Sequence, residues 1–141
     1  MGLRKHMTPE LDKKLVKDFP LLYQQRDWPM THTAMCWGFP GDGWEPLIRE
    51  LSEKIEAHNK QNPKNPVEAV QVKEKFGGLR FYVHGAPEEI WDLIQEAEEK
   101  SFRICEFCGK PGKPRSTGWI KTLCDECYKS VQNRKNEHDR V

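Results

Sequence analysis

Four of the five cysteines in this chain form two pairs near its carboxyl end. Cys105 and Cys108 enclose two residues, as do Cys124 and Cys127, and fifteen residues separate the pairs. This spacing is typical of four-cysteine zinc sites, because a two-residue turn aims both sulfurs at one ion about 2.3 Å away. Gly109, directly after the first pair, permits the left-handed backbone that such a turn tends to need. The spacing predicts one Zn²⁺ ion held by all four thiolates.

Disulfide bonds and thiol redox chemistry are the competing interpretations of these cysteines, since C-x-x-C also occurs in oxidoreductases. Nothing in the sequence indicates the oxidising compartment that disulfides need, and a redox pair leaves the second pair unexplained. Zinc is therefore the favoured interpretation. With four protein ligands the ion has no open position for water, so its predicted role is structural rather than catalytic.

The residues that follow the first cysteine pair predict the type of zinc module. Residues 119–123 have the pattern of a returning strand, and residues 128–134, directly after Cys127, have that of a helix. One pair on a turn and one at a helix start favour a treble-clef-like finger over an all-β zinc ribbon. We therefore expect residues 103–141 to form a four-cysteine zinc-binding module with a C-terminal helix.

Residues 1–102 show the patterns of a small α+β domain. Apolar residues at helical spacing predict helices over about residues 8–19, 44–59 and 86–102, with Thr8 as the cap of the first and Asp42 or Gly43 as the cap of the second. The absence of a Gly/Ser linker around residues 101–103 predicts that this domain and the zinc module pack together.

Between the second and third helices the apolar period changes from 3.6 to 2, which predicts a β-hairpin with its turn at residues 76–78. Its apolar face is expected to pack on the helices. The residues of that face are Val70, Val72, Leu79, Phe81 and Val83.

Residues 19–44 form a long irregular segment that is rich in proline and glycine but also holds several aromatic rings. A loop longer than about 15 residues is uncommon in a compact domain unless it is functional or packed by its own side chains. Two interpretations stay open. The rings cover the sheet and extend the core, or Trp28, Trp37 and Phe39 form an apolar surface that binds a partner protein.

The polar face of the hairpin mixes cations with an aromatic ring, and such a face can hold phosphates and stack bases. It is equally well explained as the solvated face of an antiparallel sheet. The nucleic-acid-binding alternative uses residues from this face, from the zinc module and from the last helix. These candidates are Lys73, Arg80, Tyr82, Lys121 and Arg134.

The charge distribution argues little for DNA binding. Residues 1–102 carry 14 Lys+Arg and 17 Asp+Glu, whereas residues 103–141 carry 9 and 5. Four thiolates on one Zn²⁺ would lower the positive net charge of the second part by two. That part would then lack the strongly basic patch of a dedicated duplex binder. No apolar run approaches the roughly 18 residues of a membrane span, and no secretory signal is visible, so we expect a cytoplasmic protein without a membrane partner.

An enzyme is the third hypothesis. Cys36 follows His32 by four residues, so a thiol nucleophile with a nearby base is conceivable, and His84 at a strand end could act as a general base. Cys36 is better explained as a small buried hydrophobic residue. No Gly-rich phosphate loop, serine elbow or carboxylate-rich metal motif accompanies these residues.

Three pieces of the chain together resemble a group of small proteins of tailed phages and prophages. They are the Gly-Asp-Gly-Trp helix start at residues 41–44, the hairpin of residues 72–82, and the two-knuckle module of residues 104–127. The resemblance covers about residues 36–128. It implies a viral protein that acts in the bacterial host cytoplasm, where accessory phage proteins bind host factors or counter defence systems. The leading expectation is therefore a non-enzymatic accessory protein that binds a host protein.

Overall fold

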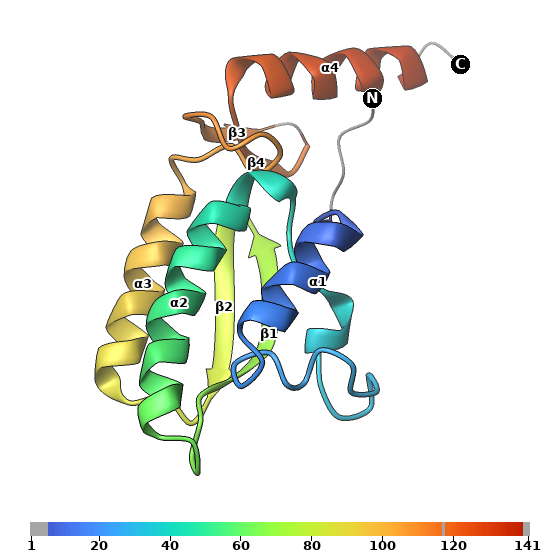
Figure 1. Ribbon diagram of the computed structural model, residues 1–141. Coiled ribbons are helices and arrows are strands. Elements are labelled where there is room, and N and C mark those ends of the chain that lie inside the picture. Colours follow the sequence, from blue (N-terminus) through green and yellow to red (C-terminus); the bar gives the residue numbers. More distant parts are fainter. Residues whose placement is uncertain (1–5, 117, 140–141) are drawn as a thin grey trace.

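The computed structural model describes residues 6–116 and 118–139, of which residues 135–139 are described by their backbone only. Within these residues the chain is α+β, with four α-helices and two two-stranded antiparallel sheets (Figure 1). The predicted fold class is therefore confirmed. The elements are α1 (Pro9–Asp18), the 3₁₀ turns η1 (Met35–Trp37) and η2 (Asp42–Trp44), α2 (Glu45–Gln61), β1 (Glu68–Lys75), β2 (Gly78–His84), α3 (Glu88–Ser101), β3 (Lys113–Ser116), β4 (Ile120–Leu123) and α4 (Asp125–Asp139).

The starts of α1 and α2 depart from the predicted caps. Thr8 occupies the N-cap position of α1, but its side chain makes no capping hydrogen bond. Its backbone N–H instead donates to Asp42 Oδ1 at 2.7 Å, which joins the two helix starts. Trp44 is the N-cap of α2, so neither Asp42 nor Gly43 caps that helix. Asp42 is used to connect two segments that lie far apart in the sequence.

The β1–β2 hairpin turns within the stretch that the sequence predicts. Phe76 and Gly77 have φ values of 53° and 86°, the left-handed pair that a tight hairpin turn requires. A bulge between Ala69 and Gln71 shifts the register of β1. Because a shift of one residue reverses the face of a strand, Ala69 is buried with Val72, and the prediction that Val70 lies in the core face is wrong.

One hydrophobic core joins α1, α2, α3, the hairpin and part of the long 19–44 segment. Helix α3 packs on β2, and α2 lies beside α3 (Figure 1). Leu22, Tyr23, Met35 and Phe39 from the long segment are buried in this core. The first interpretation of that segment therefore holds for these residues.

The second sheet, β3–β4, and helix α4 form the carboxyl-terminal part of the molecule, where α4 extends across one end of the structure (Figure 1). We call residues 6–102 the body and residues 103–139 the cysteine module. Within the described ranges, none of the helices combines the length and the apolar character needed to cross a bilayer.

Candidate metal centre and adjoining groove

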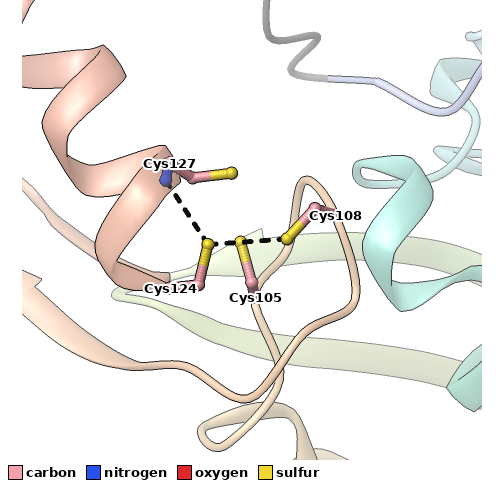
Figure 2. A group of neighbouring side chains, drawn as sticks. All are labelled: Cys105, Cys108, Cys124 and Cys127. Carbon is pink, nitrogen blue, oxygen red and sulfur yellow. Dashed lines mark hydrogen bonds between the residues drawn. The ribbon is translucent and has the colours of Figure 1, made fainter.

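The four paired cysteines come together in the cysteine module, as their spacing predicts (Figure 2). Their Sγ atoms all lie within 4.8 Å of one another, and those of Cys108 and Cys124 are 3.5 Å apart. In a tetrahedral site with metal–sulfur bonds of about 2.3 Å, the sulfurs are about 3.8 Å apart. The cluster therefore fits a single metal ion held by four cysteine ligands.

Each pair is positioned by a different local structure. The first lies on a turn after α3, where the Gly109 N–H donates to the Cys105 carbonyl at 3.0 Å. Gly109 has a φ of 81°, the left-handed conformation that the sequence predicts for it. The second pair spans the end of β4 and the start of α4, and the Cys127 N–H donates to Cys124 Sγ at 3.3 Å. A turn and a helix start thus aim the sulfurs at a common point.

The cluster is shielded on most sides. Cys105, Cys124 and Cys127 are buried, whereas Cys108 is exposed. Burial and hydrogen bonds with the neighbouring thiols raise the pKa of Cys127 above its ordinary value. A divalent cation at this point would favour the thiolates and release their protons.

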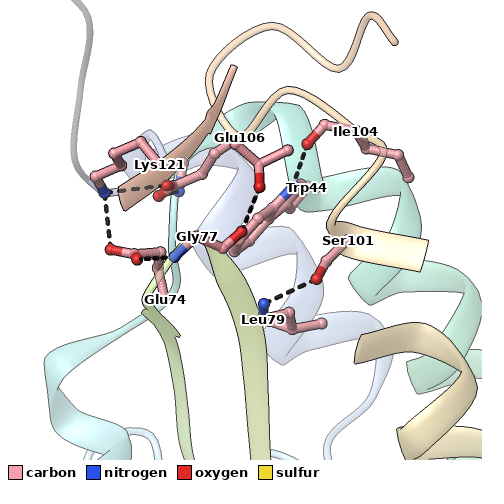
Figure 3. A network of polar contacts seen from close by, with 10 residues as sticks. Trp44, Glu74, Gly77, Leu79, Ser101, Ile104, Glu106 and Lys121 are labelled. Carbon is pink, nitrogen blue, oxygen red and sulfur yellow. Dashed lines mark hydrogen bonds and ion pairs between the residues drawn. The ribbon is translucent and has the colours of Figure 1, made fainter. Parts of the chain in front are cut away.

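The first knuckle docks on the body through the Gly-Asp-Gly-Trp segment. The Gly43 N–H donates to the Glu106 carbonyl at 2.8 Å, and Trp44 Nε1 donates to the Ile104 carbonyl at 2.8 Å (Figure 3). A Cβ atom at Gly43 would collide with the Cys105 carbonyl oxygen. Gly43 does not have a positive φ, so the close approach, not the turn, requires glycine there. The sequence did not predict this contact, because the Gly-Asp-Gly-Trp pattern is also accounted for as the start of a helix.

A buried ion pair completes the junction between body and module. Lys121 Nζ lies 3.1 Å from Glu106 Oε1 and 2.9 Å from Glu74 Oε1 (Figure 3). The Glu106 side chain is 1% exposed, and it also accepts a hydrogen bond from the Gly41 N–H. Burial raises the pKa of Glu106 above its ordinary value. Burial alone would lower the pKa of Lys121, but the Glu106 and Glu74 carboxylates raise it above its ordinary value.

Next to this junction lies a groove of about 440 Å³. Three segments form most of its lining: residues 37–40 from the end of η1 onward, residues 71–76 of the hairpin, and residues 119–121 of the cysteine module. His6 and Glu106 complete it. Trp37, Phe76 and Trp119, which lie on these three segments, are 65%, 66% and 66% exposed. The groove therefore exists only where the body and the module meet.

The predicted partner-binding residues separate into two groups. Trp37 lines the groove, and Trp28 is exposed elsewhere on the same long segment. Phe39 is 1% exposed and packs edge-on against Tyr23 with ring centroids 5.0 Å apart. Its ring belongs to the core and cannot serve as an exposed anchor, which corrects that part of the prediction.

The predicted nucleic-acid-binding residues are only partly brought together. Pairing of β1 with β2 places Lys73 opposite Arg80, and Lys73 Nζ lies 5.7 Å from the centre of the Tyr82 ring. Lys121 has a side chain only 12% exposed and pairs with two carboxylates, so it is not available for phosphate. Arg134 is exposed on α4.

The residues of the enzyme hypothesis do not share the groove. Cys36 lies in η1, where it is half-buried rather than fully buried, and its Sγ donates to the Thr33 carbonyl at 3.5 Å. His84 is exposed at the end of β2. Neither residue lines the groove, and among the described side chains no contact pairs them as nucleophile and base.

A scan against protein-family models and searches of curated proteins and of solved structures find no match to this chain. The phage resemblance therefore stays a prediction. The proposals that follow rest on the site geometry and, for the phage-type role, on that resemblance.

Proposed function

We propose that this chain is a non-enzymatic, phage-type accessory protein that folds around one structural zinc ion and binds a bacterial host protein through the groove. The observation that carries this proposal is the grouping of Trp37, Phe76 and Trp119 around one groove at the junction of the two parts. Large exposed rings around a hollow are the usual anchors of protein interfaces. The host cytoplasm as the place of action rests on the phage resemblance.

Zinc is the metal that this donor set favours. Four thiolates in a tetrahedral arrangement select zinc or iron–sulfur chemistry, and paired C-x2-C knuckles around a single ion point to zinc. A knuckle, then the β3–β4 hairpin, then α4 is the order expected of a treble-clef-like finger. This order supports that classification of the cysteine module.

The backbone at Phe76 gives independent support for a contact role. The first central position of a tight hairpin turn favours Asn, Asp or Gly, because its φ is positive. Here a phenylalanine with a φ of 53° holds that position and exposes its ring. Bulky residues persist in such conformations mainly where function benefits.

The test is capture of partners from bacterial lysate by zinc-loaded protein, with and without nuclease, read by mass spectrometry. Trp37→Ala and Trp119→Ala should each abolish capture of a nuclease-resistant host protein while the melting temperature stays within a few degrees. Trp28→Ala and Trp91→Ala are matched controls, since both rings are exposed but lie outside the groove. Equal loss in all four variants would contradict the groove as the binding surface.

Nucleic-acid binding is the second candidate, and the Lys73–Tyr82 contact beside Arg80 is the observation that favours it. Partners that vanish with nuclease would support it. Phosphate contacts release counterions, so affinity for a single-stranded oligonucleotide should then fall steeply as salt rises. Loss of that binding in Lys73→Gln and Arg80→Gln, with Trp37→Ala unaffected, would assign the function to the hairpin face.

A further inference from the structure

We propose that the groove receives an extended peptide segment of the partner protein, which adds to β1 as a third strand. This inference rests on the proposed function and specifies how the groove binds. It follows from the hydrogen-bonding pattern of the hairpin, from the residues along the groove, and from the charges beside it.

The hydrogen bonds of β2 show which residues of β1 face outward. The Leu79 N–H donates to Ser101 Oγ and the Phe81 N–H donates to Glu98 Oε2, both at 2.9 Å. These two N–H groups therefore point away from β1. In an antiparallel pair, residues that point away from each other alternate with hydrogen-bonded ones. Their partners in the register, Glu74 and Val72, must also direct their N–H and C=O groups away from β2.

The outer edge of β1 is covered along one half only. Near its start, the Ala69 N–H donates to the Leu22 carbonyl at 2.8 Å, and the Val70 carbonyl accepts from Thr33 Oγ1 at 3.4 Å. In the part of the chain that the structure describes, the outward N–H and C=O groups of Val72 and Glu74 have no such partner. The free edge of β2 is covered by side chains of α3, so this stretch of β1 is the open edge of the hairpin.

The groove follows that open edge. Six consecutive residues, 71–76, line it. A groove over one face of a strand would be lined by alternate residues, whereas a groove along an edge meets every residue. Residues 37–40 and 119–121 form its walls, so a chain lying in the groove would run beside β1 between Trp37 and Trp119.

The size and charge of the groove define the occupant. The backbone groups of Val72 and Glu74 face the groove, and the length of strand they span gives room for an added strand of about four to five residues. Lys73 and Lys75 line the groove, and within the described residues neither forms an ion pair. An added strand would place its own side chains beside theirs, where opposite charges stabilise the pair. The peptide should therefore carry an acidic residue facing the lysines and apolar residues facing the tryptophans.

Natural proteins usually cover or shorten such edges, because unpaired backbone groups invite another strand. Here the same chain places Leu22, Thr33, Glu98 and Ser101 on other edge positions, whereas in the described residues the part of the β1 edge that lies in the groove has no such cover. Strand addition of this kind takes its affinity from main-chain hydrogen bonds and its specificity from alternate side-chain pockets.

The experiment uses a displayed library of random peptides of about seven residues, selected against the zinc-loaded full chain, followed by N-methyl scanning of the best binder. Methylation removes one backbone donor at a time. We expect affinity to fall about tenfold at every second peptide position and to change little between them, since alternate peptide N–H groups face β1. In ¹⁵N-labelled protein, the Val72 and Glu74 amides should become protected from exchange on binding.

Any other outcome overturns strand addition, and the outcomes below also show whether the proposed function fails with it. Binding that needs Trp37 and Trp119, but shows no period of two and no protection of Val72 and Glu74, would overturn strand addition and leave the groove as a protein-binding surface. Selection of no peptide, or a dimer of this chain that protects the same two amides, would overturn a partner's peptide as the occupant. Capture of nucleic acid that competes for Trp37 would overturn both proposals. Trp28→Ala again serves as the control variant.

Discussion

The body buries aliphatic and aromatic side chains from every one of its helices and strands, whereas the buried residues of the hydrophobic cluster in the cysteine module are Leu123 and three of the four clustered cysteines. A segment as short as the module cannot bury enough apolar surface to fold by that means alone. A metal ion bound by the four-cysteine cluster would substitute for a core there. The proposed zinc ion would thus give the module a source of stability concentrated at a single point, whereas that of the body is distributed over many contacts.

The junction between the body and the cysteine module is held neither by a hydrophobic core nor by the cysteine cluster. It includes a backbone hydrogen bond from Gly43, a buried ion pair at Lys121, and a hydrogen bond from Thr122 Oγ1 to the Gly77 carbonyl at 2.6 Å. Such contacts are directional and fix one arrangement of the two parts. The groove depends on that arrangement, because its walls come from both sides.

Metal removal should have the largest effect, and it tests the difference in stability between the body and the cysteine module. Structural zinc contributes roughly 10 kcal/mol of folding free energy in small zinc modules, so a chelator or Cys124→Ser should unfold the cysteine module. The body should keep its dispersed amide signals, because its core contains no metal ligand. Two-dimensional ¹H–¹⁵N spectra and a zinc assay give both readouts. Less than one zinc per chain in fresh reduced protein, or module signals unchanged by chelation, would contradict a metal-held module.

Gly43→Ala should have the next largest effect. The added methyl group meets backbone atoms of the first knuckle, which cannot move aside as a flexible side chain can. We expect a loss of about 4 kcal/mol in the free energy of unfolding, measured by urea denaturation. Gly85→Ala is the matched control, since Gly85 has a φ of 80° but an added Cβ there would meet only the Pro66 carbonyl oxygen, at an ordinary 3.6 Å, and it should cost only about 1 kcal/mol. Equal costs would mean that the close approach at Gly43 is unimportant.

Lys121→Met tests the buried ion pair. The substitution keeps the aliphatic stem but leaves Glu106 and Glu74 without their cation, and we expect a loss of about 2–3 kcal/mol. Lys110→Met removes an exposed ion pair with Glu126 in the same module and should produce no measurable change. Thermal denaturation of both variants provides the comparison. If they behave alike, the ion pair does not hold the junction together.

Phe76→Asn should have the smallest effect, and its sign should be opposite. Asparagine adopts the left-handed conformation more readily, so the variant should gain about 0.5–1 kcal/mol of stability. The same variant should bind the partner less well, because it loses a ring on the rim of the groove. A stabilised variant with unchanged binding would show that Phe76 is not part of the contact surface. A destabilised variant would mean that the ring packs on the module.

Local patterns predicted most of the elements. The helices α1, α2 and α3 and the hairpin turn lie where periodicity and glycine placement put them. The errors arise where local and tertiary demands differ. The bulge in β1 moved Val70 off the core face, and Asp42 bonds to the Thr8 backbone instead of capping α2. Both residues take part in contacts between segments that a local window does not include.

One of the candidate sites, the cysteine cluster, could be predicted from local patterns, whereas the groove could not. The spacing of Cys105, Cys108, Cys124 and Cys127 was sufficient to predict their cluster, because two short turns with fixed spacing can aim four sulfurs at one point. The groove could not be predicted, since most of its lining comes from residues 37–40, 71–76 and 119–121, which lie far apart in the chain. Trp37 and Phe39 are two residues apart, and only packing decides that one is exposed and the other buried.

The cysteine cluster, the helices and the hairpin were readable from the residues alone, because these features depend on spacing and periodicity within short stretches of chain. Three further features required the folded molecule: Gly43 and Glu106 dock the module on the body, Lys121 lies buried in an ion pair, and half of the β1 edge stays open. Those features depend on which distant segments meet and on which backbone groups each segment covers.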